Sequence, residues 1–291
     1  MTMIGIAIVN YRNADDTAGL VQSLVARNTT PGTRVSIAIV DNSDQRPELE
    51  AVVEFAQQNG MSSRLIHGHG NVGYAAGNNL AAAWLLEMGA AVIWVLNPDT
   101  RITGGTLASA LEVLRTGERA IGATSVPGPY GFGRPDLGVL DLWTGQSGQP
   151  SAAGVVGPRK LRYVAGHSLV VTRQAWQDLG GFSEDFFLFF EEADLAVRSA
   201  QLGIPIAVIA ELAVDHAGGG ATGATRDMRA KSRIAYFHAS RSCMIFFRKH
   251  HRPRVPLALA ARVAYAGKAL LIGGPAAANA IIRGVVAGLR A

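Results

Sequence analysis

Short apolar runs alternate with helical patterns along the first hundred residues. Residues 4–9, 35–40 and 91–96 are apolar runs of the length of a strand, while residues 20–25 and 49–56 carry apolar residues at helical spacing. Fully apolar strands that alternate with helices are typical of a parallel sheet covered on both faces. The pattern therefore predicts an α/β fold with a Rossmann-like, mostly parallel sheet and helices on both faces.

The pattern changes after residue 120. Residues 124–162 are rich in Gly and Pro and predict long loops and short strands. From Met228 onward the pattern is helical. Between these regions the spacing predicts strands over 161–172 and 206–214, helices over 174–179 and 191–202 that end at glycines, and a Gly-rich loop over 218–223.

Charge divides the chain into two parts. Residues 1–225 carry 14 basic and 21 acidic side chains, a net charge of −7, whereas residues 226–291 carry 13 basic and 1 acidic, a net charge of +12. We therefore expect a catalytic domain over 1–225, with halves of about 1–120 and 121–225, and a basic helical extension over 226–291. Such a tail favours an anionic partner, such as membrane headgroups, a lipid diphosphate or nucleic acid.

The tail is expected to lie on a membrane surface without crossing it. Its longest stretch without a charge, 269–282, has 14 residues and contains a Gly-Gly-Pro interruption, whereas a span needs about 20 apolar residues. Basic residues beside an apolar helix face favour a surface helix, while packing on the domain and a dimer interface are the alternatives. The apolar face of the first tail helix is predicted to contain Ile234, Phe237, Met244 and Phe247.

The N-terminus and the cysteine content set the expected compartment. Residues 1–8 have no basic flank and no cleavage-site pattern, so they indicate a first strand and not a signal peptide. The one cysteine, Cys243, allows no disulfide framework within the chain. We expect a cytoplasmic protein that lies peripherally on the inner face of the cell membrane.

Polar clusters follow three predicted strands at their carboxyl ends, where α/β sheets bind ligands. They are Asn10-Tyr11, Asp41-Asn42-Ser43 and Asn97-Pro98-Asp99. Asp41 can accept the imide N–H of uracil or thymine, or it can form a helix N-cap or an Asx turn. Asp99 can hold a hard divalent cation against a diphosphate, or it can belong to a turn that ends the strand.

An aromatic block precedes three carboxylates. Residues 186–190 contain four Phe, and Glu191, Glu192 and Asp194 follow them directly. Crowded acids beside an apolar wall raise at least one pKa, which suits a general base. A helix dipole favours an acidic first turn as well, but it does not explain the aromatic block.

Two other features allow either a functional or a structural role. His216 follows an apolar run and can bind a metal or serve as a structural histidine. The turn over 71–79 can direct backbone N–H groups toward a diphosphate, although tight turns need glycine anyway.

In order and spacing, these features resemble family 2 glycosyltransferases over roughly residues 4–250, in particular bacterial rhamnosyltransferases that act on polyprenyl-diphosphate sugars. The matching pieces are Asn10-Tyr11, Val40-Asp41-Asn42-Ser43, Asn71-x-Gly73-Tyr74 with Asn79, Asn97-Pro98-Asp99, Ala165-Gly166-His167-Ser168-Leu169, Gly180-Gly181-Phe182, Phe189-Phe190-Glu191-Glu192-Ala193-Asp194-Leu195, and His216.

The resemblance implies a GT-A fold and a role for each matching residue. It implies that Asp41 binds the pyrimidine and that Asp99 is the metal-binding end of the Asp-x-Asp motif, whose first Asp is Asn97 here. His216 would complete the shell of one Mg or Mn ion. Glu192 matches the catalytic base, with Glu191 or Asp194 as substitutes. The implied nucleotide-sugar contacts are Asn10, Tyr11, Asp41, Asn71, Gly73, Asn97 and Asp99, and the implied acceptor contacts are Gly166 and His167.

The resemblance implies an inverting, metal-dependent transfer of a sugar from a nucleotide diphosphate to a hydroxyl. The donor would be dTDP-rhamnose and the acceptor a lipid-linked saccharide in cell-wall or surface polysaccharide synthesis. A nucleotidyltransferase and an inactive nucleotide-sugar-binding protein of the same fold are the alternatives. The expected partners are a nucleotide sugar, an acceptor, the membrane surface and a second copy in a homodimer, but not nucleic acid.

Overall fold

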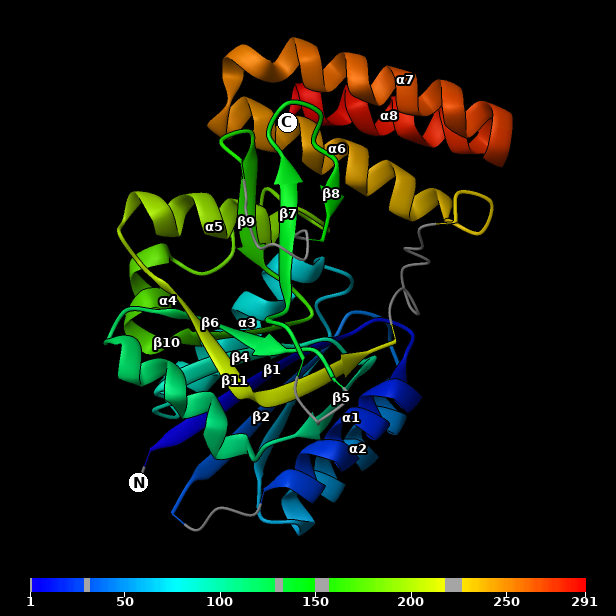
Figure 1. Ribbon diagram of the computed structural model, residues 1–291. Helices are drawn as coiled ribbons and strands as arrows, with labels where there is room; N and C mark the ends of the chain where they lie inside the picture. Colours follow the sequence, from blue (N-terminus) through cyan, green and yellow to red (C-terminus); the bar gives the residue numbers. More distant parts are fainter. Residues whose placement is uncertain (1, 29–31, 129–132, 150–156, 218–226) are drawn as a thin grey trace. The chain divides into compact units, whose positions relative to one another are not determined.

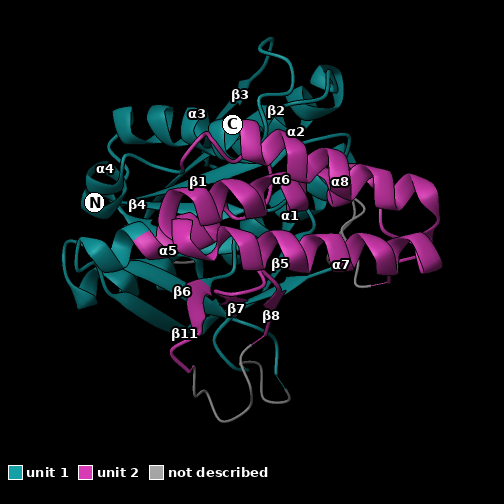
Figure 2. Ribbon diagram, turned by 90° about the horizontal axis from the view of Figure 1, so that it is seen from above, with its two compact units in different colours: residues 1–137, 164–182, 198–217 teal, residues 138–163, 183–197, 218–291 magenta. Residues whose placement is uncertain are grey.

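The computed structural model describes residues 2–28, 32–128, 133–149, 157–217 and 227–291. The chain forms two compact units, each assembled from separate segments (Figure 2). Unit 1 comprises residues 1–137, 164–182 and 198–217, and unit 2 comprises residues 138–163, 183–197 and 218–291. The basic tail is therefore grouped by its contacts with two segments of the expected acceptor half.

Unit 1 is built on an eight-stranded sheet in the order β3-β2-β1-β4-β10-β6-β11-β5. The first four strands in this order pair in parallel, whereas β10 is antiparallel to β4 and β6, and β5 is antiparallel to β11. A Rossmann-like half is thus extended by a mixed half. The strands are β1 (Met3–Asn10), β2 (Arg34–Asp41), β3 (Ser62–Ile66), β4 (Val92–Leu96), β5 (Thr100–Gly104), β6 (Ile121–Ser125), β10 (Ser168–Thr172) and β11 (Ile206–His216).

The two faces of β1 explain why helices cover the sheet on both sides. Ile6 belongs to the core cluster that contains Leu20 of α1 and Leu49 of α2. The neighbouring Gly5 points to the other face, where an added Cβ would lie 3.0 Å from the Cβ of Leu85 on α3. The predicted α/β fold is confirmed. The helices of unit 1 are α1 (Ala14–Arg27), α2 (Arg46–Gln58), α3 (Tyr74–Glu87), the 3₁₀ helix η1 (Leu107–Thr116) and α4 (Arg173–Leu179).

Unit 2 combines a small sheet, in the order β8-β7-β9, with three long helices that lie side by side (Figure 1). On α8, Gly284 and Gly288 lie against the carbonyl oxygens of Phe237 and Arg241 on α6, where any Cβ would clash. Glycine therefore sets the close approach of these helices. The elements are β7 (Leu137–Asp141), β8 (Ser147–Gly148), β9 (Lys160–Val164), the start of α5 (Glu191–Gln201), α6 (Arg233–His250), η2 (Arg252–Arg254), α7 (Val255–Gly273) and α8 (Pro275–Arg290).

The single strand predicted over 161–172 is wrong, because the structure has two strands there. β9 belongs to the small sheet, whereas β10 pairs with β4 and β6 in the large one. The short segment 165–167 separates them. A continuous apolar pattern shows that a segment is extended, but it does not show which sheet each part joins.

The apolar face predicted for the first tail helix is largely buried within unit 2. Met244 and Phe247 are fully buried and Phe237 is half-buried, while Ile234 is exposed. The exposed large apolar residues of α7 are Leu257, Val263, Leu270, Leu271 and Ile272.

Because these exposed apolar side chains lie on α7, membrane contact is expected at α7 and not at the buried face of α6. Within the described residues, Arg252–Gly273 is the one helical segment long and apolar enough to cross a membrane by length and composition. Peripheral binding without a span therefore stays a prediction. The loop predicted over 218–223 lies outside the described residues.

Candidate active site

A buried hydrogen-bond cluster joins the ends of β1 and β2. Asn10 Nδ2 donates to Asp41 Oδ1 at 3.3 Å, and Thr17 Oγ1 donates to Asn10 Oδ1 at 3.0 Å. Asp41 Oδ1 accepts from Ser43 N at 2.9 Å, and Asp41 Oδ2 accepts from Gln45 N at 2.8 Å. Asp41 therefore forms the Asx turn that was the structural alternative. A carboxylate has about four lone-pair sites, so this turn leaves Oδ2 able to accept an imide N–H.

The Gly-rich turn is hydrogen-bonded to this cluster. Asn42 Nδ2 donates to Gly73 O at 3.1 Å, and Asn71 Oδ1 accepts from Gly73 N at 3.0 Å. Gly73 has a φ of +87° and precedes Tyr74, the first residue of α3. Only glycine adopts this conformation without strain. Tyr11 is half-buried in the loop after β1, and the nucleotide contacts of Tyr11, Asn71 and Gly73 stay predictions.

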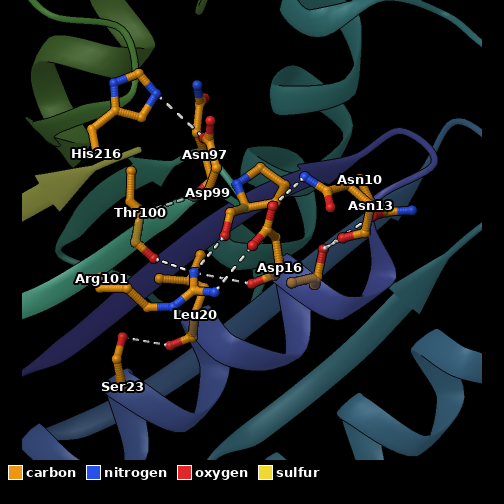
Figure 3. Close-up of polar contacts among 12 residues, drawn as sticks. Asn10, Asn13, Asp16, Leu20, Ser23, Asn97, Asp99, Thr100, Arg101 and His216 are labelled. Carbon is orange, nitrogen blue, oxygen red and sulfur yellow. Dashed lines mark hydrogen bonds and ion pairs between the residues drawn. The ribbon is translucent and has the colours of Figure 1, made fainter. Parts of the chain in front are cut away.

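Asp99 and His216 lie together because β5 and β11 pair in antiparallel fashion, with Thr100 opposite His216. Asp99 Oδ1 is 3.3 Å from His216 Nε2 (Figure 3). The two side chains are 10% and 26% exposed, so a ligand can reach them. One ion held at about 2.1 Å by neighbouring ligands places them about 3 Å apart, which matches this pair.

The donor atoms here fit a hard divalent cation. Asn97 Oδ1, in the same turn as Asp99, is buried and has no hydrogen-bond partner among the described residues. Within the described ranges, no group of three or more His, Cys, Asp or Glu side chains is placed to hold a metal ion. Mg or Mn bound here would thus take diphosphate oxygens and water as its remaining ligands, as such ions commonly do.

Arg101, which the sequence analysis missed, fixes the turn that carries Asp99. Its Nη1 donates to Pro98 O at 3.0 Å, and its Nη2 donates to Asp16 Oδ1 at 3.2 Å (Figure 3). Gly19 on α1 leaves room for this guanidinium, because a Cβ there would clash with it. Main-chain carbonyls are the main targets of Arg101, so no sequence pattern marked its role.

His167 stacks on His216, with ring centroids 3.9 Å apart and planes 18° apart. Nε2 of His167 lies 2.5 Å from Asp136 Oδ2, and Gly166 O accepts from Tyr74 OH at 2.8 Å. The structure thus brings His167 to the Asp99–His216 pair, while the carbonyl of the preceding Gly166 is held by Tyr74. Asp136 was also missed, because it lies in a Gly/Pro-rich stretch without a regular pattern. The acceptor contacts themselves stay predictions.

In unit 2, a strained aromatic pair precedes Glu191 and Glu192. Phe189 and Phe190 have φ values of +67° and +71°, a region that bulky residues avoid. Such strain costs about 1–3 kcal/mol per residue and is concentrated at functional sites. The Oε2 atoms of both glutamates are shielded from solvent and have no hydrogen-bond partner in the part of the chain that the structure describes.

Burial raises the pKa of both glutamates. The pKa of Glu191 is raised well above its usual value by burial and then by the charges of Glu192 and Asp194. The pKa of Glu192 is raised by burial. Burial and the same two glutamates also raise the pKa of Tyr163. Glu191 is only 5% exposed, whereas Glu192 is half-buried, so Glu192 has the more accessible carboxyl group of the two.

Asp194 has a structural position. Its side chain is fully buried, and its Oδ1 accepts from His250 Nε2 at 2.7 Å with Lys249 Nζ 3.5 Å away. Lys249 Nζ also lies 2.9 Å from Asp185 Oδ2. These contacts attach the start of α5 to α6, so they favour an anchoring role over the predicted role of substitute base.

The first part of the chain matches a known protein family. A family model described as "Glycosyl transferase family 2" covers residues 5–175, which is more than half of the chain. No curated protein matches the chain.

Three solved structures are similar in fold. TarS 1-349 from S. aureus has 14% identity and a TM-score of 0.52, over 92% of this chain and 73% of that one. GalNAc-T7 with UDP, GalNAc and Mn2+ has 15% and 0.58, over 83% and 50%. The mannosyltransferase PcManGT from Pyrobaculum calidifontis with GDP-Man and Mn2+ has 15% and 0.57, over 99% and 86%. At these identities the likeness shows the fold alone.

Proposed function

We propose that this chain, which belongs to glycosyl transferase family 2 and has the GT-A fold of nucleotide-sugar glycosyltransferases, is an inverting, metal-dependent enzyme. It moves a sugar from a nucleotide diphosphate to an acceptor hydroxyl. The observation that carries this proposal is the Asp99–His216 pair at the carboxyl edge of the sheet. The hydrogen-bonded turn of Asn10 and Asp41 lies on the same edge.

Glu192 is the proposed general base. A raised pKa makes a carboxylate a stronger proton acceptor, and the burial of Glu192 supplies that shift. Its carboxylate takes the proton of the acceptor hydroxyl as the oxygen attacks the anomeric carbon from the face opposite the diphosphate. The configuration at that carbon therefore inverts, and no covalent enzyme intermediate is required. Glu191, the first residue of the same helix, is more deeply buried and holds its proton more firmly.

Asp99, His216 and the amide oxygen of Asn97 are the residues that would hold Mg or Mn. When bound, such an ion neutralises charge that develops on the departing nucleoside diphosphate. Arg101 supports this role by fixing the turn of Asp99 through Pro98 and Asp16. The solved structures of GalNAc-T7 and PcManGT contain Mn2+, which supports the proposal.

The proposed donor is dTDP-rhamnose. Asp41 Oδ2, with only Gln45 N as its partner among the described residues, can accept the imide N–H that thymine and uracil share. The similar structures carry UDP, UDP-GlcNAc or GDP-Man, so the fold accommodates several nucleotides. The choice of rhamnose rests on the sequence resemblance alone.

The proposed acceptor is a lipid-linked saccharide in cell-wall or surface polysaccharide synthesis, reached from the inner face of the cell membrane. The exposed apolar side chains of α7, among them Leu271 at 88% exposure, support membrane contact. Arg252 and Arg254 at the start of the same helical segment, and the exposed Lys268 within it, add positive charge. Apolar area together with basic residues favours binding to anionic lipid.

The proposal is tested by measuring released nucleoside diphosphate from a panel of nucleotide sugars, with Mn, with Mg and with chelator. We expect release from one pyrimidine-linked donor that requires metal and increases with a lipid-linked acceptor. The anomeric configuration of the product is then read by NMR. Release of pyrophosphate from a nucleoside triphosphate would favour a nucleotidyltransferase instead. Donor binding without turnover under all these conditions would favour an inactive binding protein.

A further inference from the structure

A cavity of about 440 Å³ lies within unit 2, between α6 and α8. Its volume falls in the range of about 300–1,000 Å³ that is typical of small-molecule sites. Its principal lining residues are Arg233, Ile234, Phe237 and His238 from α6, and Asn279 and Arg283 from α8.

The charge of this cavity is positive and uncompensated. Its lining includes two arginines and no carboxylate, and neither Arg233 nor Arg283 has an ion pair or a hydrogen bond from its side chain among the described residues. A second cavity of about 380 Å³, on the C-terminal half of α6, differs because Asp185 is part of its lining and pairs with Lys249 at 2.9 Å. Among the residues that the structure describes, the first cavity therefore has no carboxylate in its lining, whereas the second has one.

Apolar side chains form much of the rest of the lining of the first cavity. Ile234 is 55% exposed, and Phe237 is half-buried. On α8, Ala276 and Ala280 add apolar surface to the lining. His238 Nδ1 is a buried ring nitrogen that has no partner in the described parts of the chain. This combination suits a ligand with a charged head and an apolar chain.

We propose that the cavity between α6 and α8 binds the diphosphate and first isoprenoid units of a prenyl-diphosphate lipid, the anchor of the acceptor. The proposal rests on the lipid-linked acceptor of the proposed function. Guanidinium groups bind phosphate oxygens in a bidentate manner, so Arg233 and Arg283 hold the diphosphate. Ile234 and Phe237 contact the chain. A free phosphate would gain nothing from these apolar walls, and a nucleotide would find few polar partners for its base.

The test uses the full chain and farnesyl diphosphate as a soluble probe, with binding measured by calorimetry. Inorganic pyrophosphate, farnesol and a short-chain phosphatidylglycerol are compared with it. We expect farnesyl diphosphate to bind at least about tenfold more tightly than each of these, because only it satisfies both parts of the cavity. Arg233→Gln and Arg283→Gln should each weaken binding about tenfold. Arg290→Gln, an exposed arginine on α8 outside the cavity, should leave it unchanged.

Each contrary result overturns the inference in a distinct way. Equal binding of pyrophosphate would indicate a simple phosphate site, and equal binding of phosphatidylglycerol would indicate general affinity for anionic lipid. Wild-type affinity in Arg283→Gln would show that farnesyl diphosphate does not bind in this cavity. Donor binding, followed by thermal shift in the same samples, separates this outcome from failure of the proposed function. A chain that binds a nucleotide sugar but not farnesyl diphosphate keeps that function and loses this inference.

Discussion

Two groups of predicted site residues, one in each unit, differ in how their polar groups are satisfied. In unit 1, Asn10 and Asp41 are linked to each other and to neighbouring backbone by hydrogen bonds. In unit 2, Glu191 and Glu192 each keep a buried oxygen without a partner in the described residues, directly after a strained backbone. A satisfied network holds a ligand in a fixed position, whereas an unsatisfied carboxylate is ready to accept a proton. Binding and proton transfer therefore need opposite environments.

The largest expected effect is the loss of the general base. Glu192→Gln should lower turnover by about 10²–10⁴-fold, because the amide cannot accept the acceptor's proton, while donor binding stays near that of the wild type. Initial rates and donor affinity are measured on the same preparation. Glu184→Gln, an exposed glutamate of unit 2, is the matched control. Wild-type turnover in Glu192→Gln would show that unit 2 does not supply the base through this residue.

The next effect concerns the metal residues of unit 1. Asp99→Ala and His216→Ala should each weaken Mn binding and reduce turnover by about 10-fold or more. Even the loss of a residue that only supports a metal ligand has an effect of this size. Mn affinity is measured by electron paramagnetic resonance without substrate. Asp215→Ala, one residue before His216 and exposed, serves as the control. Unchanged Mn affinity in both variants would show that Asp99 and His216 do not bind the metal.

The raised pKa values of the glutamates give unit 2 a specific pH dependence. Their carboxyls hold protons more firmly in the folded chain, because burial raises the pKa. The folded state therefore binds more protons than the unfolded state above the ordinary value of 4.5, so stability from this source falls as pH rises toward the folded pKa. Turnover should instead rise with pH on the acid side of its pH profile, because Glu192 must be ionised to accept a proton.

Glu191→Gln separates these two trends. It removes the buried charge, so its Tm relative to the wild type should increase as pH is raised from mildly acidic to mildly alkaline values. Thermal unfolding and the pH profile of turnover are compared across that range. A constant difference in Tm would show that Glu191 has an ordinary pKa in the folded chain.

The smallest effect is expected at the membrane. Leu271→Asp on α7 should reduce co-sedimentation with anionic liposomes several-fold, because it removes apolar area and adds repulsion. Leu80→Asp on α3, where the leucine is 39% exposed, is the control in unit 1. Binding that does not respond to salt, lipid charge or Leu271→Asp would assign the exposed face of α7 to another partner, such as a second copy of the chain.

The sequence alone determined the α/β fold and the order of the polar clusters. Apolar runs such as 35–40 and 91–96 place apolar side chains on both faces of a strand. Both faces of the sheet must therefore be covered, as they are in an α/β fold. The family resemblance and the match over residues 5–175 agree, because the motifs lie at strand ends whose positions follow from local patterns. The crowding of Glu191 and Glu192 after an aromatic block was also visible in the sequence, and their raised pKa values bear out that reasoning.

Only the tertiary structure decided which of these residues meet, and what else holds them. Asp136 and His167 are 31 residues apart in the chain, and Arg101 binds carbonyl groups that have no sequence signature. Asp194 looked like Glu191 in the sequence, but its pairing with His250 on α6 gives it an anchoring position. The burial of Met244 likewise depends on the close approach of a glycine on α8. Local patterns fix the conformation of a segment, whereas long-range packing fixes its neighbours.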